Sequence, residues 1–354
     1  MNKIKTLIIG VLAIGVSLGL SAQDIHFSQF YMSPLNLNPA MTGVTNCDQR
    51  AIVNYRNQWA GVVGANAYNT YSASYDRKLA VGQEDYFGVG GTLWGDVAGE
   101  SRFGTRQARV SFAYSKKMGG RRKVSHFLSV GADAGITNRA VSEADLRWPS
   151  QVTNGVFDNT VGNPEAIPNS SFIYPDLSAG LLWFSTFGDR KSLYGGVAMH
   201  HMNQPNVSFL GRDENLYSKL TIHGGGEYPI NPKVSIKPDF VYLQQGPHTQ
   251  INAGTSVRFK MGASGPRNVN STEMGQFFQV GAWYRVGNKV DGGIHSDALI
   301  VVSRFDFDRY GIGFSYDLNI SKLNQAASGN GSFELSLNYL ICGSSSRGVY
   351  CPVF

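Results

Sequence analysis

The sequence lacks long hydrophobic runs, because no apolar stretch of about 18 residues or more occurs beyond its first 22 residues. This absence excludes a helical membrane protein. Charge is also scarce, since only 16% of the residues are charged and the net charge is +6. Removing Lys3 and Lys5 with the leader lowers the net charge to about +4, which is too small and too dispersed to indicate a nucleic-acid partner.

Residues 1–22 have the pattern of a signal peptide. Lys3 and Lys5 precede the apolar run TLIIGVLAIGVSLGL, which is shorter than the roughly 20 residues that a membrane-spanning helix needs. The small residues of LSA, ending at Ala22, form a cleavage site, so the mature chain is expected to begin at Gln23. No cysteine follows this site, which argues against a lipid anchor. Export places the three cysteines where disulfides persist.

The mature chain is rich in glycine and aromatic residues, and apolar and polar residues alternate along many of its segments. Its 42 Gly, 17 Tyr and 20 Phe, with few charges, suit a sheet whose alternate residues face lipid and water. In YGIGFSYDLN (310–319) and SFELSLNYLI (332–341), apolar and polar residues strictly alternate. Secreted β-sandwiches and propellers share this pattern, but they would expose far fewer aromatic side chains.

Segments of this kind predict about fourteen strands, most of them about 9 to 12 residues long, the length that crosses a bilayer at a tilt. They lie near 50–59, 69–79, 87–97, 107–117, 127–139, 175–186, 193–202, 219–229, 234–244, 250–261, 276–286, 298–305, 310–318 and 332–341. Longer and shorter connections roughly alternate, with 262–275 and 245–249 as exceptions. We therefore predict an all-β fold, a transmembrane antiparallel β-barrel closed because an open edge cannot stand in lipid.

Nothing in the sequence points clearly to an enzyme, a metal or a cofactor. The glycines of Gly88–Gly95 lack the lysine and helix of a phosphate loop. His200 and His201 are adjacent, so in a strand they should point to opposite faces, and no third metal ligand is well spaced. An outer-membrane hydrolase remains an alternative, because residues such as His223 and Ser256 could assemble across strands, but polar lining of the lumen explains them better.

The cysteines are candidates for one disulfide. If the first and last strands pair, Cys47 and Cys342 become neighbours at the periplasmic rim, and Cys351 can fold back to the same place. One bond and one remaining thiol are then expected, with three reduced cysteines as the alternative.

The segment before the first strand has neither helical nor strand periodicity. Its two X-Pro steps, Ser33-Pro34 and Asn38-Pro39, allow only extended or single-turn structure. Its apolar residues Phe27, Phe30, Tyr31 and Leu35 are too dense for a disordered linker. We expect a plug or a clamp at the barrel rim. The predicted organisation is a signal peptide (1–22), a plug or periplasmic segment (23–49), a barrel (50–341) and a periplasmic tail (342–354).

The motifs HFSQFYMSPLNLNPAMTG, NYRNQWAG, TYSASYD and the terminal CPVF resemble the PorP/SprF family of type IX secretion outer-membrane proteins. The resemblance covers nearly the whole mature chain. The positions that match the family pattern or supply apolar docking contacts are Phe27, Ser28, Gln29, Phe30, Tyr31, Pro34, Asn38, Pro39, Asn54, Tyr55, Arg56, Asn57, Gln58 and Trp59. We expect these residues to serve structure or docking, not catalysis. The last strand ends about a dozen residues before Phe354, which departs from a simple C-terminal assembly signal.

The resemblance implies an accessory of type IX protein secretion in the outer membrane. Expected partners are the translocon and periplasmic ring subunits, outer-membrane lipid, and an exported substrate with a C-terminal sorting domain, such as a gliding adhesin. The basic turn residues Arg121, Arg122 and Lys123 are candidates for docking to the ring, although a solvated charge run is the commoner explanation. A passive diffusion channel for small solutes is the main alternative.

Overall fold

The computed structural model describes residues 24–82, 84–120, 124–143, 146, 148–153, 155–158, 160–161, 167–188, 190–261, 275–288, 293–321, 331–342 and 351–352. The predicted signal peptide, the start at Gln23, the docking residues Arg121, Arg122 and Lys123, and most of the tail lie outside the described residues.

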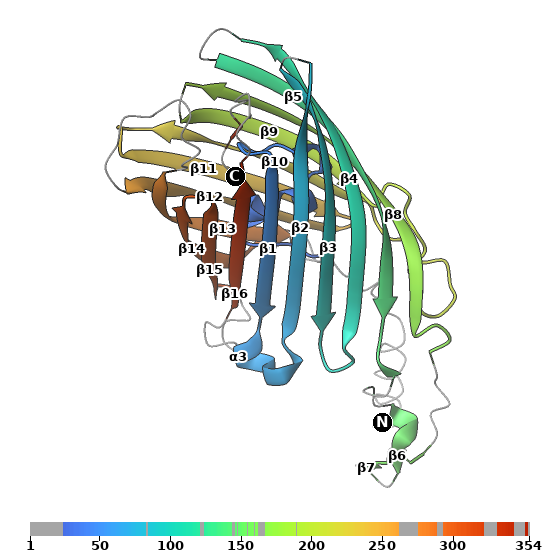
Figure 1. Cartoon of the computed structure of the whole chain (residues 1–354). Helices are drawn as coiled ribbons and strands as arrows, with labels where there is room; N and C mark the ends of the chain where they lie inside the picture. Colours follow the sequence, from blue (N-terminus) through green and yellow to red (C-terminus); the bar gives the residue numbers. More distant parts are fainter. Residues whose placement is uncertain are drawn as a thin grey trace.

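Fourteen strands of the described chain form one closed antiparallel barrel (Figure 1). They are β1 (Gln49–Gln58), β2 (Tyr68–Val81), β3 (Asp85–Ala98), β4 (Phe103–Gly119), β5 (Val124–Ala140), β8 (Ser171–Phe187), β9 (Lys191–His200), β10 (Lys219–Pro229), β11 (Val234–Gln245), β12 (His248–Met261), β13 (Gln276–Asn288), β14 (Ile294–Phe307), β15 (Tyr310–Asn319) and β16 (Ser332–Ile341). Each predicted strand is confirmed. Most strands, notably β4, β5 and β8, extend beyond the predicted bounds, because the alternation fades towards their solvated ends.

The barrel closes where β1 pairs with β16, from Gln49 opposite Ile341 to Gln58 opposite Ser332. We call the end where β1 begins and β16 ends the inner end, and the opposite end the outer end. Outer connections contain α3 (Ala60–Val63), η3 (Gly64–Asn66), η5 (Pro149–Gln151) and a small hairpin of β6 (Val152–Thr153) and β7 (Val156–Phe157). No described helix is long and apolar enough to cross a membrane.

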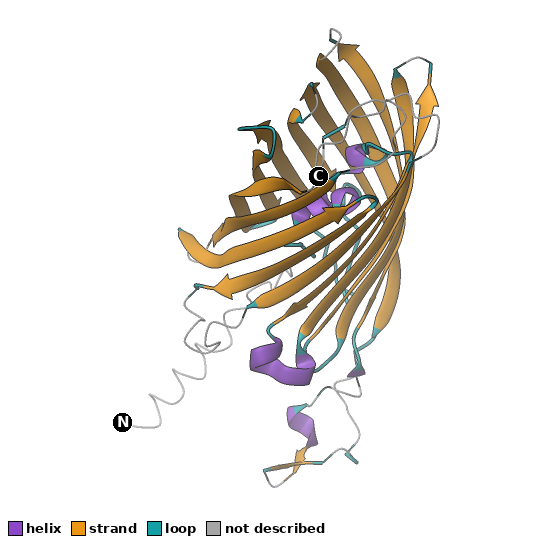
Figure 2. Cartoon of the chain, turned by 60° about the vertical axis from the view of Figure 1, so that its left-hand side comes forward, coloured by secondary structure: helices purple, strands orange, loops and turns teal. Residues whose placement is uncertain are grey.

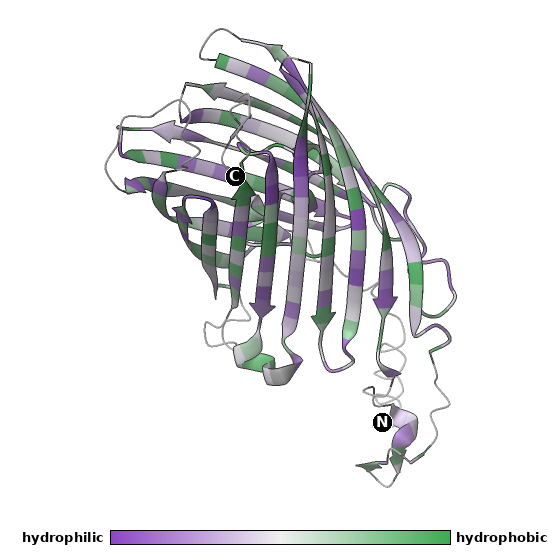
Figure 3. Ribbon diagram, viewed as in Figure 1, coloured by the Kyte–Doolittle hydropathy of each residue, from purple (hydrophilic) through white to green (hydrophobic). Residues whose placement is uncertain are grey.

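Alternation along the strands sorts the side chains between lumen and exterior. In β15, Tyr310, Ile312 and Phe314 are exposed outside, whereas Ser315 and Asp317 are buried in the lumen. Figure 3 shows the resulting mixture of hydrophilic and hydrophobic bands along the strands. The same apolar exterior recurs around the barrel, at Val53, Leu93, Phe112, Val130, Ile136, Leu181, Leu193, Phe240, Val280, Val301 and Leu335. This surface is what a lipid-embedded barrel requires.

Residues 24–48, which we call the plug segment, lie inside the barrel. Its short helices are η1 (Phe30–Met32), α2 (Pro34–Leu37) and η2 (Pro39–Met41), and Figure 2 shows them enclosed by strands. η1 and α2 end after a single turn because Pro34 and Pro39 lack the N–H that a continuing helix needs, and Asn38 before Pro39 is extended at φ −160°. The largest buried apolar cluster joins the plug segment to the lumen wall.

Candidate functional site

The plug segment begins at the outer end of the lumen with a cluster of charged groups, which we call the outer anchor. Asp24 Oδ2 accepts from Lys219 Nζ at 2.8 Å and lies 3.1 Å from His201 Nε2. The other ring nitrogen of His201 lies 2.9 Å from Asp176 Oδ1. The Asp24 backbone N–H donates to Gln245 Oε1 at 2.8 Å. Three separate strand ends therefore meet at the first described residue of the plug segment.

Mutual attraction in the outer anchor holds its groups charged. Burial alone would raise the pKa of Asp24, but Lys219 and His201 hold that pKa well below its usual range. Burial alone would lower the pKa of His201, but the carboxylates of Asp24 and Asp176 raise it to about 9. At neutral pH the imidazolium is therefore held between two carboxylates.

The next residues of the plug segment contact acidic groups on β15 and β16. The backbone N–H groups of Ser28 and Gln29 donate to the Glu334 carboxylate at 2.7 and 3.0 Å. The Ser28 hydroxyl donates to Asp317 Oδ2 at 2.8 Å. Arg56 and Arg285 contact that same oxygen at 3.2 and 2.8 Å. The wall thus binds backbone as well as side chains, which explains how a segment without Asp, Glu, Lys or Arg between residues 25 and 47 is held in a charged lumen.

The motif NYRNQWAG, here called the first-strand motif, begins on β1 and places alternate side chains on the two faces of that strand. Asn54 points inward, where its Nδ2 donates to Met32 O at 3.1 Å and to Ser336 Oγ at 2.9 Å. Arg56 also points inward and donates to His26 O at 2.5 Å. Tyr55 points outward and its hydroxyl donates to Asn69 Oδ1. The matched residues therefore have two roles, with Asn54 and Arg56 holding the plug segment and Tyr55 bracing the neighbouring strand from outside.

Asn38 anchors the middle of the plug segment. Its side-chain amide donates to Leu181 O at 3.0 Å and lies 3.0 Å from His223 Nε2, while its Oδ1 accepts from Ala40 N–H at 2.8 Å. An asparagine before proline thus caps η2 and pins it to the wall at the same time. Phe27, Phe30, Tyr31 and Leu35 are all buried, and the rings of Tyr31 and Trp283 lie 5.5 Å apart.

An ion pair, here called the inner anchor, holds the other end of the plug segment. Arg50 binds Asp76 through two nitrogens, each at 2.9 Å, and donates to the carbonyls of Met41 and Val44. Asp76 also accepts from Gly43 N–H at 2.7 Å. Both charged side chains are almost fully buried. This bidentate geometry fixes three parts of the chain at one point.

Glycines on the wall give the plug segment room to approach. A Cβ on Gly88 would stand 2.0 Å from Thr42 O, and one on Gly180 would stand 2.1 Å from Asn38 Oδ1. Equivalent contacts would arise at Gly131 with Ala40 and at Gly313 with Gln29. Gly43 itself has φ +75° and faces Gly88. These wall glycines, here called the glycine seat, therefore form the surface on which the plug segment packs.

The cysteines lie at the inner end. Cys47 and Cys342 form a disulfide with Cα atoms 4.4 Å apart, which links the plug segment to the end of β16. Cys351 is buried, and its backbone N–H donates to Asn46 Oδ1 at 2.7 Å. The described part of the tail therefore returns to the base of the plug segment.

The histidine pair differs from expectation. His200 and His201 were predicted to face opposite sides of a strand, but both are buried towards the lumen. The reason is that β9 ends at His200 and His201 adopts φ +55°, which turns its ring inward. His200 lies near Leu37 O, whereas His201 meets Asp24. Within the described residues, no group of three or more histidine, cysteine or acidic side chains is arranged to bind a metal ion.

Sequence reasoning also missed residues that position the plug segment. Asp24, Asp76, Arg285, Asp317 and Glu334 were not singled out, and His201 was considered only as a metal ligand. Charged residues at lumen-facing positions of alternating strands were the available signal, since burying an unpaired charge is costly.

The fold and its lumen define a closed, lipid-exposed barrel of the outer membrane that carries its own N-terminal plug. The sequence matches the model of the family described as "Type IX secretion system membrane protein PorP/SprF" over residues 19–339. The chain belongs to this family and is an outer-membrane component of type IX secretion.

Among solved structures, the chain is similar to the toluene transporter TbuX of Ralstonia pickettii, with 11% identity over 87% of this chain and 92% of that chain and a TM-score of 0.44. It is also similar to CdiB from Escherichia coli, with 8% identity over 82% of this chain and 63% of that chain and a TM-score of 0.46. A search of curated proteins found no match.

Proposed function

We propose that the protein is an accessory of the type IX system that binds the sorting domain of a particular exported protein and links it to the periplasmic ring. The observation that carries the proposal is a lumen filled by its own plug segment. Contacts hold this segment from Asp24 at one end to the disulfide of Cys47 at the other. A barrel blocked in this way is better suited to holding partners than to passing bulky solutes.

The outer rim is our proposed contact surface for the exported protein. Phe209, in the connection between β9 and β10, packs against Phe172 and Phe103 with ring centroids 5.0 and 5.9 Å apart. Arg139 lies 5.6 Å above the Phe103 ring. Aromatic side chains and arginine are the types most enriched in protein interfaces.

The inner turns are the proposed contact surface for the ring. The turn between β4 and β5 carries Arg121, Arg122 and Lys123, which suit an acidic partner. Charge reversal is the direct test of that role, because it inverts the attraction without touching the barrel wall.

The test is a mild-detergent pull-down of the tagged protein from its native outer membrane, followed by mass spectrometry. The wild type should recover ring or translocon subunits and one large exported protein. Changing Arg121, Arg122 and Lys123 to Glu should remove the ring subunits, whereas Arg212→Glu, an exposed outer residue, should not. Phe209→Ser should lose the exported protein, while Phe307→Ser, exposed at the inner end, should keep it. Recovery of a clean monomer from wild-type membranes would refute the proposal.

A further inference from the structure

The two sides of the lumen differ in how their polar side chains are satisfied. On β4 and β5, Ser111 Oγ meets Thr42 Oγ1 at 3.0 Å and Ser129 Oγ donates to Ala40 O at 2.7 Å. Here Arg109, Asp133 and Arg139 each leave an atom unpaired, but each has another partner. We call this side, formed by β2–β5, β8 and β9, the seat wall.

The opposite side, formed by β10–β13, we call the bare wall. Eight of its side-chain atoms are buried without a hydrogen-bond partner in the described chain. Three of them belong to His223, Asp239 and Arg258, each of which has another partner. The other five are Thr221 Oγ1, Asn252 Oδ1, Ser256 Oγ, Gln279 Nε2 and Trp283 Nε1. Each of these residues is only 1% exposed. The Tyr31 hydroxyl, on the face of the plug segment towards Trp283, also has no partner there.

Leaving such groups unpaired is expensive. Each buried orphan costs about 1–3 kcal/mol, so five would cost roughly 5–15 kcal/mol, which is as large as the stability of a whole domain. Buried groups of this kind are normally satisfied by water. The bare wall therefore has the chemistry of a hydrated surface, whereas the seat wall has that of a protein interface.

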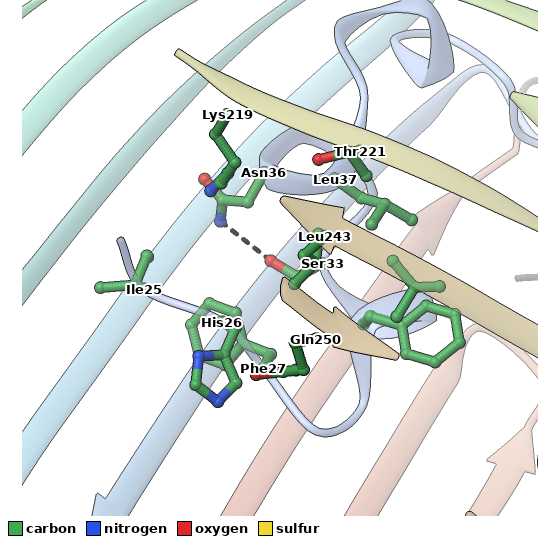
Figure 4. Close-up of a pocket in the computed structure, with 12 residues that line it drawn as sticks. Ile25, His26, Phe27, Ser33, Asn36, Leu37, Lys219, Thr221, Leu243 and Gln250 are labelled. Carbon is green, nitrogen blue, oxygen red and sulfur yellow. Dashed lines mark hydrogen bonds between the residues drawn. The ribbon is translucent and has the colours of Figure 1, made fainter. Parts of the chain in front are cut away.

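Small cavities lie along the same wall at the outer end. Two of them, of about 30 and 20 Å³, are lined in common by Ile25, His26, Lys219, Leu243 and Gln250. Figure 4 shows the larger one between the plug segment and these strands, with Thr221 at its edge. A water molecule needs about 10–15 Å³ of such space, so each cavity can hold one or two.

The unpaired groups continue from these cavities towards the inner end. Thr221 lies on β10, Asn252 and Ser256 lie on β12, and Gln279 lies on β13. Asn252 and Ser256 are four residues apart, which is about 13 Å along the strand, and Trp283 pairs with Gly254 between them. Gln279 neighbours Arg258 across the β12–β13 pairing. Arg258 in turn bonds to Asp306, which is partly exposed at the inner end.

From this arrangement we propose that a hydrated passage for water and small inorganic ions runs along the bare wall, past the plug segment, and is narrowed where Tyr31 meets Trp283. The passage goes beyond the proposed secretion role and does not depend on it.

Two matched serines test the passage. Ser256→Cys and Ser129→Cys are made in a Cys351→Ser background that keeps the native disulfide, and Ag⁺, a small inorganic cation that binds thiols, is applied to the intact protein. Both serines are at most 1% exposed, but only Ser129 is bonded to the plug segment. Ser256→Cys should react at least about tenfold faster. Equal rates, fast or slow, would overturn the proposal. Thr221→Cys against Ser111→Cys is the second pair if either first variant fails to fold.

Conductance gives an independent measurement. Wild-type protein in planar bilayers should pass small monovalent ions, and Ser256→Trp should reduce this conductance at least about twofold. Val280→Trp, on the lipid-facing side of β13, should leave it unchanged. A wild-type barrel that does not conduct would overturn the passage.

Discussion

The plug segment is held at both ends, but by different chemistry. The inner anchor pairs the Arg50 guanidinium with the Asp76 carboxylate, and a disulfide at the same end adds a covalent link. The outer anchor depends on an imidazolium between two carboxylates, and it therefore has a pH range. The difference teaches that only the outer end is held by a contact that depends on a histidine, and therefore on pH. The predictions that follow try to break this contrast.

The largest effect is expected from Asp76→Ala, which leaves the Arg50 guanidinium buried and unpaired. Removing one partner of a buried pair costs about 3–5 kcal/mol. The measurement is the urea midpoint of the barrel in detergent. Glu84→Ala provides the control, because the exposed Glu84–Lys117 pair is also at the inner end and should contribute less than about 1 kcal/mol. Equal midpoints for the two variants would refute a structural role for the inner anchor.

The outer anchor should open in alkaline solution. The pKa of His201 is raised to about 9 from an ordinary value of about 6.5, so its stabilising contribution is complete below about pH 6.5 and is lost as pH rises through about 9. The pKa of Asp24 is lowered, so its contribution is lost only in strong acid.

Hydrogen exchange followed by mass spectrometry measures this opening. After correction for the intrinsic pH dependence of exchange, residues 24–29 should lose protection between pH 7 and 10, and residues 41–46 should not. In the His201→Gln variant, the protection of residues 24–29 should no longer depend on pH more strongly than that of residues 41–46. Parallel loss at both ends would show that the plug segment moves as one body.

A smaller effect is expected from the glycine seat. Gly88→Ala places a methyl group against the Thr42 carbonyl, and such overpacking costs about 1–3 kcal/mol. Gly91→Ala is the matched control, because Gly91 lies on the same strand and its Cβ would make only an ordinary 3.5 Å contact. The midpoint of unfolding distinguishes them. If Gly88→Ala unfolds at the same midpoint as the wild type, the backbone around Thr42 and Gly88 can shift to accommodate the added methyl group.

The smallest effect separates the two faces of the first-strand motif. Asn54→Ala removes bonds to Met32 and Ser336 and should cost about 1–2 kcal/mol. Tyr55→Phe removes one exposed hydrogen bond and should change stability by less than about 0.5 kcal/mol. The reverse order would mean that the motif stabilises the sheet more than the plug segment.

Strand number and the sidedness of residues were predictable because each depends on local period-two alternation. Contacts across the lumen were not. Asp317 meets Ser28, Arg56 and Arg285 only through the stagger with which the barrel closes, and no local pattern encodes that stagger. His201 illustrates a second limit. Its inward turn depends on where β9 stops, and strand ends are set by the surrounding loops more than by alternation.

The disulfide also makes the molecule a covalent ring. Cys47 lies just before β1 and Cys342 immediately follows β16, so the joining of the two edges of the sheet brings their sulfur atoms together. The bond ties the ends of the barrel together across its closing pair of strands. A non-reducing gel separates the ring from the open chain by mobility, and a chain cut once in an outer loop would stay in one piece until a reductant opened it.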